Sequence, residues 1–148
     1  MTAPANLPSL FGRFTAILQD HENLGTTLKQ LRAMCLSLET LQFLPATFAP
    51  RDLLEGLRAD LSGHFAAEEA DAYFGTIALE APLLATRIGQ LKNEHTAMLS
   101  AAASLCRVAA DAGRAAELCE ATRRLIAELE QHERAESLLL RELFASGS

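Results

Sequence analysis

Histidine and glutamate residues form a pattern that repeats once along the chain. Each half has one isolated histidine and then a histidine and a glutamate four residues apart: His21, His64 and Glu68, then His95, His132 and Glu136. Residues four apart lie on the same face of an α-helix, one turn above the other. Each His-x-x-x-Glu pair therefore directs an imidazole and a carboxylate to one spot. Four imidazoles and two carboxylates suit a pair of iron or similar ions.

The same six residues interrupt stripes of apolar side chains at helical spacing. His95, for example, lies between Leu91 and Met98, and His132 follows Leu129. A buried carboxylate without a partner costs several kcal/mol, and a cation or metal is the usual remedy. We therefore predict that all six side chains are metal ligands inside a helical core.

Helical periodicity and helix-breaking residues predict four helices, over residues 9–43, 51–75, 82–112 and 115–144. Pro45, Gly75 and Gly113 mark helix ends, and Pro82 fits the first turn of the third helix. Leu and Ala dominate the composition, which favours close-packed helices over sheets. We expect a single all-α domain over residues 1–148, folded as an up-down-up-down antiparallel four-helix bundle.

Counting residues from the predicted turns tests whether the ligands lie at one depth. His95 lies about 17 residues before the turn near residues 111–113 and His132 about 19 after it, so these two match. The first hairpin fits less well, because His21 lies about 22 residues before position 43 and His64 only about 13 after position 51. Either the first helix overshoots the second, or residues 40–53 fold back as a cap. We favour the cap.

Charge and hydropathy exclude two classes of partner. The formal net charge is −6 with no basic cluster, so the chain is not expected to bind nucleic acid. No uncharged apolar stretch is long enough to span a bilayer. Residues 1–8 also lack the basic and apolar blocks of a secretion signal, so we expect a cytoplasmic location.

The three cysteines are widely spaced and form no CxxC pair, which excludes a zinc knuckle or a thioredoxin-type motif. Cys35 and Cys106 fall on apolar helical stripes and are expected to pack in the core.

The predicted ligands divide naturally between two ions. His21 and His64 would hold one ion and His95 and His132 the other, with the two glutamates bridging them. Iron and manganese accept such mixed ligands, whereas structural zinc sites in cytosolic proteins are more often thiolate-rich. The identity of the metal stays open between Fe, Mn and Zn, because it also depends on which metal is available. With a solvent-derived oxo or hydroxo bridge, each ion would keep one open position for O2, NO or peroxide.

Two neighbouring residues carry weaker expectations. Glu69 points about 100° away from Glu68 on the helix, so we expect it to be solvated or to contact the site from outside rather than to be a ligand. Tyr73 either hydrogen-bonds near the site or packs at the helix end, and we favour packing.

Four segments together resemble the hemerythrin-like (HHE cation-binding) family, from about Phe14 to Phe144. They are Asp20-His21-Glu-Asn-Leu, Leu61-Ser-Gly-His64-Phe-Ala-Ala-Glu68-Glu69-Ala-Asp-Ala-Tyr73-Phe74, Glu94-His95-Thr-Ala-Met-Leu and Gln131-His132-Glu-Arg-Ala-Glu136. The resemblance implies a four-helix bundle with a non-haem di-iron centre. Such proteins bind O2 reversibly, sense oxygen or iron, or respond to nitrosative and oxidative stress.

One position departs from the classical pattern. Classical hemerythrins carry His-x-x-x-His on the third helix, whereas here the residue four after His95 is Leu99. The remaining set of four His and two Glu is more similar to the di-iron domain of iron–sulfur repair proteins and to bacterial hemerythrin-like sensors. Two open irons would make peroxide chemistry, NO reduction or iron release more feasible than simple oxygen storage.

Three functions follow as alternatives. The first is a non-enzymatic di-iron protein that binds O2 or NO for sensing, carriage or storage, with a second copy or a separate output protein as partner. The second is a stress-response or iron-centre repair protein acting on NO, peroxide or damaged Fe–S clusters. The third is a metal-free helical interaction domain.

Overall fold

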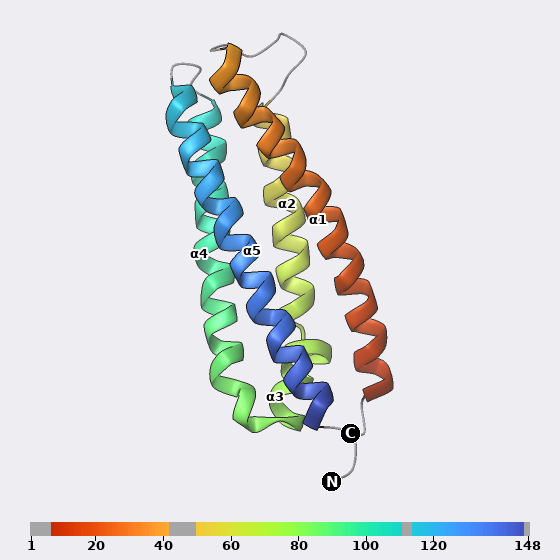
Figure 1. The fold of residues 1–148 in the computed structure, drawn as a ribbon. Helices are drawn as coiled ribbons and strands as arrows, with labels where there is room; N and C mark the ends of the chain where they lie inside the picture. Colours follow the sequence, from red (N-terminus) through yellow and green to blue (C-terminus); the bar gives the residue numbers. More distant parts are fainter. Residues whose placement is uncertain (1–6, 42–49, 111–113, 147–148) are drawn as a thin grey trace.

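The computed structural model describes residues 7–41, 50–110 and 114–146, and within these ranges it is all-helical. Four long helices pack antiparallel as a bundle, which confirms the predicted fold class (Figure 1). They are α1 (Leu7–Leu41), α2 (Pro50–Glu69), α4 (Ala85–Ala109) and α5 (Ala115–Ser146). Between α2 and α4 lie a π-helical turn (Asp71–Gly75), the short helix α3 (Thr76–Glu80) and a 3-10 turn (Pro82–Leu84).

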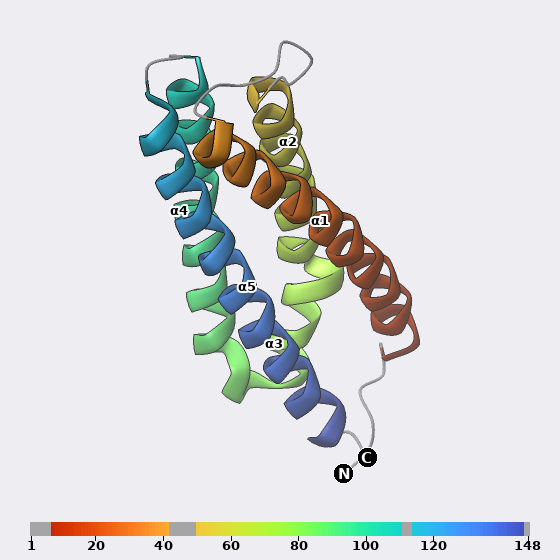
Figure 2. The same ribbon diagram turned by 45° about the horizontal axis from the view of Figure 1, so that its top comes forward.

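The long helices are arranged so that each contacts two others. The neighbouring pairs are α1 with α2, α2 with α4, α4 with α5, and α5 with α1. Figure 2 shows α4 and α5 side by side and α3 at one end of the bundle. The order α1, α2, α4, α5 therefore forms a closed ring around one central axis.

The second predicted helix, over residues 51–75, ends earlier than expected. α2 stops at Glu69, and Ala70 adopts an extended conformation with φ −61° and ψ 149°. In an uninterrupted helix, Tyr73 and Phe74 would lie about 140° and about 240° around the axis from Glu68, which are outward directions. The break instead buries both rings completely. Burial of two large aromatic side chains therefore opposes continuation of the helix.

The other predicted boundaries lie close to those of the structure. Pro82 stands in the first turn ahead of α4, as expected. α4 ends at Ala109 and α5 extends to Ser146, two residues beyond the predicted end. The predicted end of the first helix at position 43, the turn at 111–113 and most of the predicted cap over residues 40–53 lie outside the described residues.

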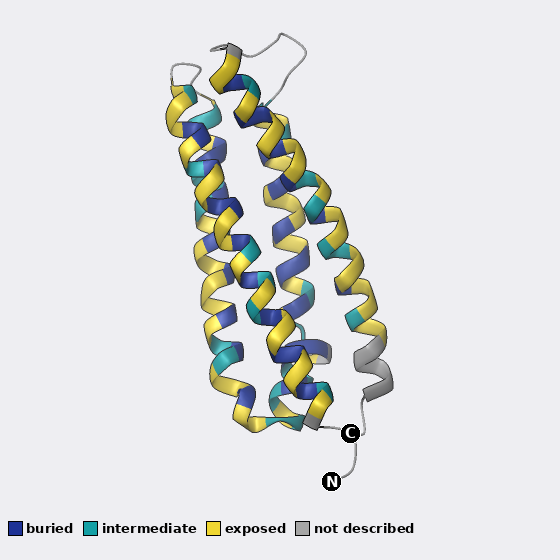
Figure 3. Ribbon diagram, in the orientation of Figure 1, coloured by how far each residue is buried: buried dark blue, intermediate teal, exposed yellow. Residues whose placement is uncertain are grey.

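Buried apolar residues form two clusters at opposite ends of the bundle. One contains Leu28, Leu61 and Leu125, and the other contains Ile17, Phe74 and Leu139. Buried positions recur along the inner faces of the long helices, where Figure 3 shows them in dark blue. The predicted ligands fall between the two clusters on α1, α4 and α5, and at the C-terminal end of α2, so the bundle carries a polar layer in the middle of an apolar core.

Cys35 and Cys106 are buried as free thiols, in agreement with core packing. None of the described helices has a segment long and apolar enough to cross a membrane.

Candidate metal centre

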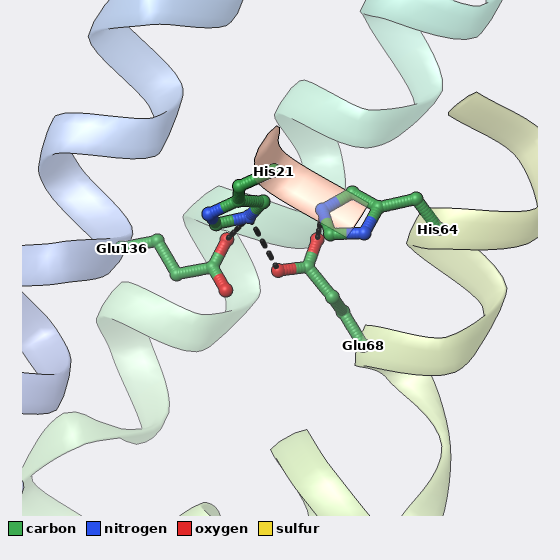
Figure 4. Close-up of side chains that lie close together, drawn as sticks. All are labelled: His21, His64, Glu68 and Glu136. Carbon is green, nitrogen blue, oxygen red and sulfur yellow. Dashed lines mark ion pairs between the residues drawn. The ribbon is translucent and has the colours of Figure 1, made fainter. Parts of the chain in front are cut away.

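The side chains predicted as ligands come together in the polar layer. Five of the six are buried, and Glu68 and Glu136 have no exposed surface at all. His21 is the most exposed, with 15% of its side-chain surface accessible. Figure 4 shows His21, His64, Glu68 and Glu136 pointing toward one another from α1, α2 and α5. Sequence spacing thus placed all six in one layer, although their role as ligands stays a prediction.

Their ligand atoms form two groups, each of which could hold a metal ion. One group contains His21, His64, Glu68 and Glu136, and the other contains Glu68, His95 and His132. This division matches the predicted assignment of histidines. Glu68 alone, among the residues that the structure describes, belongs to both groups.

The group around His95 is compact. The Nε2 atoms of His95 and His132 lie 3.1 Å apart, and His95 Nε2 lies 3.1 Å from Glu68 Oε1. Two ligand atoms that each lie about 2.1 Å from a shared ion and 3.1 Å from each other subtend an angle of about 95°. This angle is near the 90° of octahedral coordination, so the spacing suits an ion between these atoms.

The group around His21 is wider. His64 Nε2 lies 3.3 Å from Glu68 Oε1, whereas His21 Nε2 lies 4.0 Å from both Glu68 Oε2 and Glu136 Oε2. Glu136 belongs to this group only, and its Oε2 atom lies 3.9 Å from His132 Nε2, farther than Glu68 Oε1 lies from His64 or His95. Glu68 is therefore better placed than Glu136 to bridge two ions.

Three carboxylates contact the imidazoles from outside, and we call Asp20, Glu69 and Glu94 the outer carboxylates. Asp20 lies 3.5 Å from His64 Nδ1, Glu69 lies 2.9 Å from His95 Nδ1, and Glu94 lies 2.7 Å from His132 Nδ1. Glu69 contacts His95 at Nδ1 and belongs to neither of the two groups, as expected for a residue that contacts the site from outside. Asp20 and Glu94 were not predicted to contact the site, although both directly precede a predicted ligand. Such contacts orient metal-binding imidazoles.

These contacts also fix which nitrogen of His95 and His132 carries hydrogen. An ionised carboxylate only accepts hydrogen bonds, so the Nδ1 atom facing it must be the donor. In a neutral imidazole the Nε2 atom is then an acceptor. In the neutral form of both rings, the two Nε2 lone pairs therefore face each other across 3.1 Å with no hydrogen between them, and Glu68 Oε1 lies 3.1 Å from His95 Nε2. A cation at this point would convert the repulsion into coordination.

Other polar atoms of the layer also lack partners. His21 Nε2, both oxygens of Glu68 and Glu136 Oε2 are buried without a hydrogen bond. Buried polar groups are nearly always paired, and a buried charge needs a partner or a metal. The donor set of imidazoles and carboxylates fits iron, manganese or zinc.

Burial changes the proton affinities of the layer. Desolvation lowers the pKa of His21, His64 and His95, in each case as the largest cause. Desolvation, followed by the proximity of Glu136, raises the pKa of the Glu68 carboxyl well above its ordinary range. Burial therefore favours the neutral form of these three imidazoles, which is the form that binds metals.

Aromatic side chains pack against the polar layer where it meets the apolar core. The Phe65 ring stacks on His95 with centroids 3.9 Å apart, and Phe74 lies parallel to the same imidazole at 5.8 Å. The Tyr73 hydroxyl donates a hydrogen bond to Glu136 Oε1 over 3.1 Å. The favoured expectation that Tyr73 only packs was wrong, because the chain break after Glu69 turns its hydroxyl toward the site.

Comparisons with known proteins add no family to this description. No family model, no curated protein and no solved structure matches the chain. The chain is therefore described by its own structure, as an antiparallel four-helix bundle with two buried His/Glu groups that could hold metal ions.

Proposed function

We propose that the polar layer holds two non-haem iron ions and that the protein binds O2 or NO at this centre. The observation that carries the proposal is that His95 Nε2 and His132 Nε2 face each other as acceptors across 3.1 Å, with Glu68 Oε1 3.1 Å from His95 Nε2. The resemblance of segments 20–24, 61–74, 94–99 and 131–136 to the hemerythrin-like family supports iron as the metal.

The proposed ligands are those of the two groups, with His21 and His64 on one ion, His95 and His132 on the other, and the glutamates between them. Reduced iron supplies electrons to diatomic molecules, which the side chains cannot do. Burial favours the neutral form of His21, His64 and His95. The outer carboxylates orient three of the four imidazoles, and Phe65 and Phe74 cover His95 on its apolar side. Leu99 supplies no ligand one turn after His95, which leaves space in the coordination sphere for a small molecule.

A second candidate function is supported by the inequality of the two groups. The contacts of His21 are 4.0 Å long, and this imidazole is the most exposed of the set, whereas the His95 group is compact and buried. An ion held by the wider group would exchange more readily than its neighbour. This favours a role in iron donation or in repair of iron centres, as does the resemblance to hemerythrin-like proteins with four His and two Glu.

Gas binding and repair give different results in one experiment. Anaerobically purified protein is loaded with ferrous iron and exposed to O2 and, separately, to NO. A new charge-transfer band that disappears under vacuum supports reversible binding. Rapid bleaching with loss of iron to an added chelator supports the second candidate. Loaded protein with an unchanged spectrum under both gases would contradict both functions. As a control, Glu130→Gln alters an exposed carboxylate on α5 that lies outside both groups and should leave the response unchanged.

A further inference from the structure

Each outer carboxylate contacts a histidine on the next helix around the bundle. Asp20 on α1 contacts His64 on α2, Glu69 on α2 contacts His95 on α4, and Glu94 on α4 contacts His132 on α5. Each carboxylate thus reaches from its own helix to the next helix in the ring α1, α2, α4, α5. The fourth step, from α5 back to α1, has no such contact among the described residues.

Helix geometry explains the three contacts. Asp20 and Glu94 directly precede a proposed ligand on α1 and α4, whereas Glu69 directly follows one on α2. Neighbouring residues differ by about 100° around a helix. α2 runs antiparallel to α1 and α4. The residue that follows a ligand on α2 is therefore displaced around the bundle in the same direction as the residue that precedes a ligand on α1 or α4. By the same geometry, a fourth outer carboxylate is expected on α5 at the residue directly after His132.

The residue at that position is Glu133. It is half-buried, and its Oε1 atom is buried without a hydrogen-bond partner. It lines a groove of about 500 Å³ between α1 and α5 that it shares with His21. Of the four imidazoles, only that of His21 lacks an outer carboxylate in the described residues. In Figure 4 the ring nitrogen of His21 that is not directed at the glutamates lies on the side of α5.

We propose that Glu133 is the fourth outer carboxylate, and that it accepts a hydrogen bond from His21 Nδ1 when His21 Nε2 binds a metal ion. This inference rests on the proposed function. Glu133 lies in neither ligand group, so its role is to orient His21 rather than to bind the ion. A side-chain rotation within the groove would bring Glu133 Oε1 to His21 Nδ1 and complete the ring of four.

The inference is tested with full-length protein loaded with zinc, which is diamagnetic and accepts the same ligands. Nitrogen-15 NMR spectra report the Nδ1–H of each histidine and its exchange with water. We expect the His21 proton to be shifted downfield and protected. In Glu133→Ala this proton exchanges at least tenfold faster while the other three histidine signals stay unchanged, and Glu133→Gln, which retains an accepting oxygen, restores part of the protection. Glu130 lines the same groove but pairs with Arg32. The control variant Glu130→Ala should therefore leave all four histidine signals unchanged.

Metal release gives a second readout. Loss of a residue that orients a ligand typically weakens metal binding about 10–100-fold. A chelator should therefore remove one of the two zinc ions from Glu133→Ala about 10–100-fold faster than from wild type, with the second ion unaffected.

The failures can be told apart. Equal His21 exchange in wild type and Glu133→Ala would overturn the role of Glu133 while leaving the metal centre intact. A full equivalent of zinc missing from both Glu133→Ala and Glu133→Gln would identify Glu133 as a ligand and also overturn it. Wild-type protein that binds no zinc or iron would overturn the proposed function, and the inference with it.

Discussion

His95 Nε2 and His132 Nε2 face each other across 3.1 Å, although the Nδ1 atom of each ring contacts a carboxylate on its other side. The contacts with Glu69 and Glu94 place the ring hydrogens on Nδ1, so the facing atoms are both acceptors. Glu68, also fully buried, adds a carboxylate oxygen to the same point. The layer is thus arranged for a cation.

Stability of the metal-free protein should fall as the pH rises from 7 to 9. The folded-state pKa of Glu68 is raised, so over this interval the native state binds a proton that the unfolded state has released. Each such proton lowers the free energy of unfolding by up to about 1.4 kcal/mol per pH unit. The lowered pKa values of His21, His64 and His95 make the free energy of unfolding rise with pH, but only below about pH 6.5. Urea unfolding at several pH values measures the effect.

Glu68→Gln provides the matched comparison, because it keeps the shape and removes the ionisable group. Between pH 7 and pH 9 the metal-free variant should lose less stability than wild type, so the advantage of the variant over wild type should grow as the pH rises. Parallel pH profiles for the two proteins would show that Glu68 does not determine the slope.

Tyr73→Phe should destabilise the metal-free protein by about 1 kcal/mol, because it removes the hydrogen bond to Glu136 and leaves a buried oxygen without its donor. Thr122→Val is the control, since it also deletes a buried hydroxyl, but one without a hydrogen-bond partner. It should be neutral or slightly stabilising. Equal losses of unfolding free energy in the two variants would argue against a specific role for the Tyr73 hydroxyl.

Phe65→Ala should destabilise the protein by about 3–5 kcal/mol, because it creates a cavity beside His95 at a residue that is only 2% exposed. Phe65→Leu should cost less and keep the imidazole in place. Thermal unfolding of both variants measures the difference. A loss below about 1 kcal/mol for Phe65→Ala would indicate that the ring does not pack as described.

Single histidine substitutions should separate the two groups. His132→Ala removes a ligand from the compact group only, and His21→Ala from the wider group only. Each variant should therefore keep about one of two iron ions, with the ion retained by His132→Ala released faster to a chelator. Iron analysis after gel filtration gives the stoichiometry. Loss of both ions from each variant would contradict the division into two groups.

The fold and the position of the site were predictable because they depend on periodic spacing. The apolar stripes around His95 and His132, and the equal depth of these two residues, follow from helix geometry alone. The end of α2 was not predictable, since only the tertiary environment reveals that Tyr73 and Phe74 are buried at the cost of a helix break. The outer carboxylates were missed for a related reason. Asp20 and Glu94 look like solvated residues in the sequence, and their contacts depend on how the neighbouring helix is rotated.

The central claim is that two ions share Glu68, and iron binding tests it most directly. Metal-free wild type and Glu68→Ala are titrated anaerobically with ferrous iron and analysed by Mössbauer spectroscopy and metal content. The account predicts two iron ions per chain in wild type and fewer than one in Glu68→Ala, because both groups lose a shared ligand. Wild-type protein that binds no iron, or a Glu68→Ala variant that still binds two ions, would contradict it.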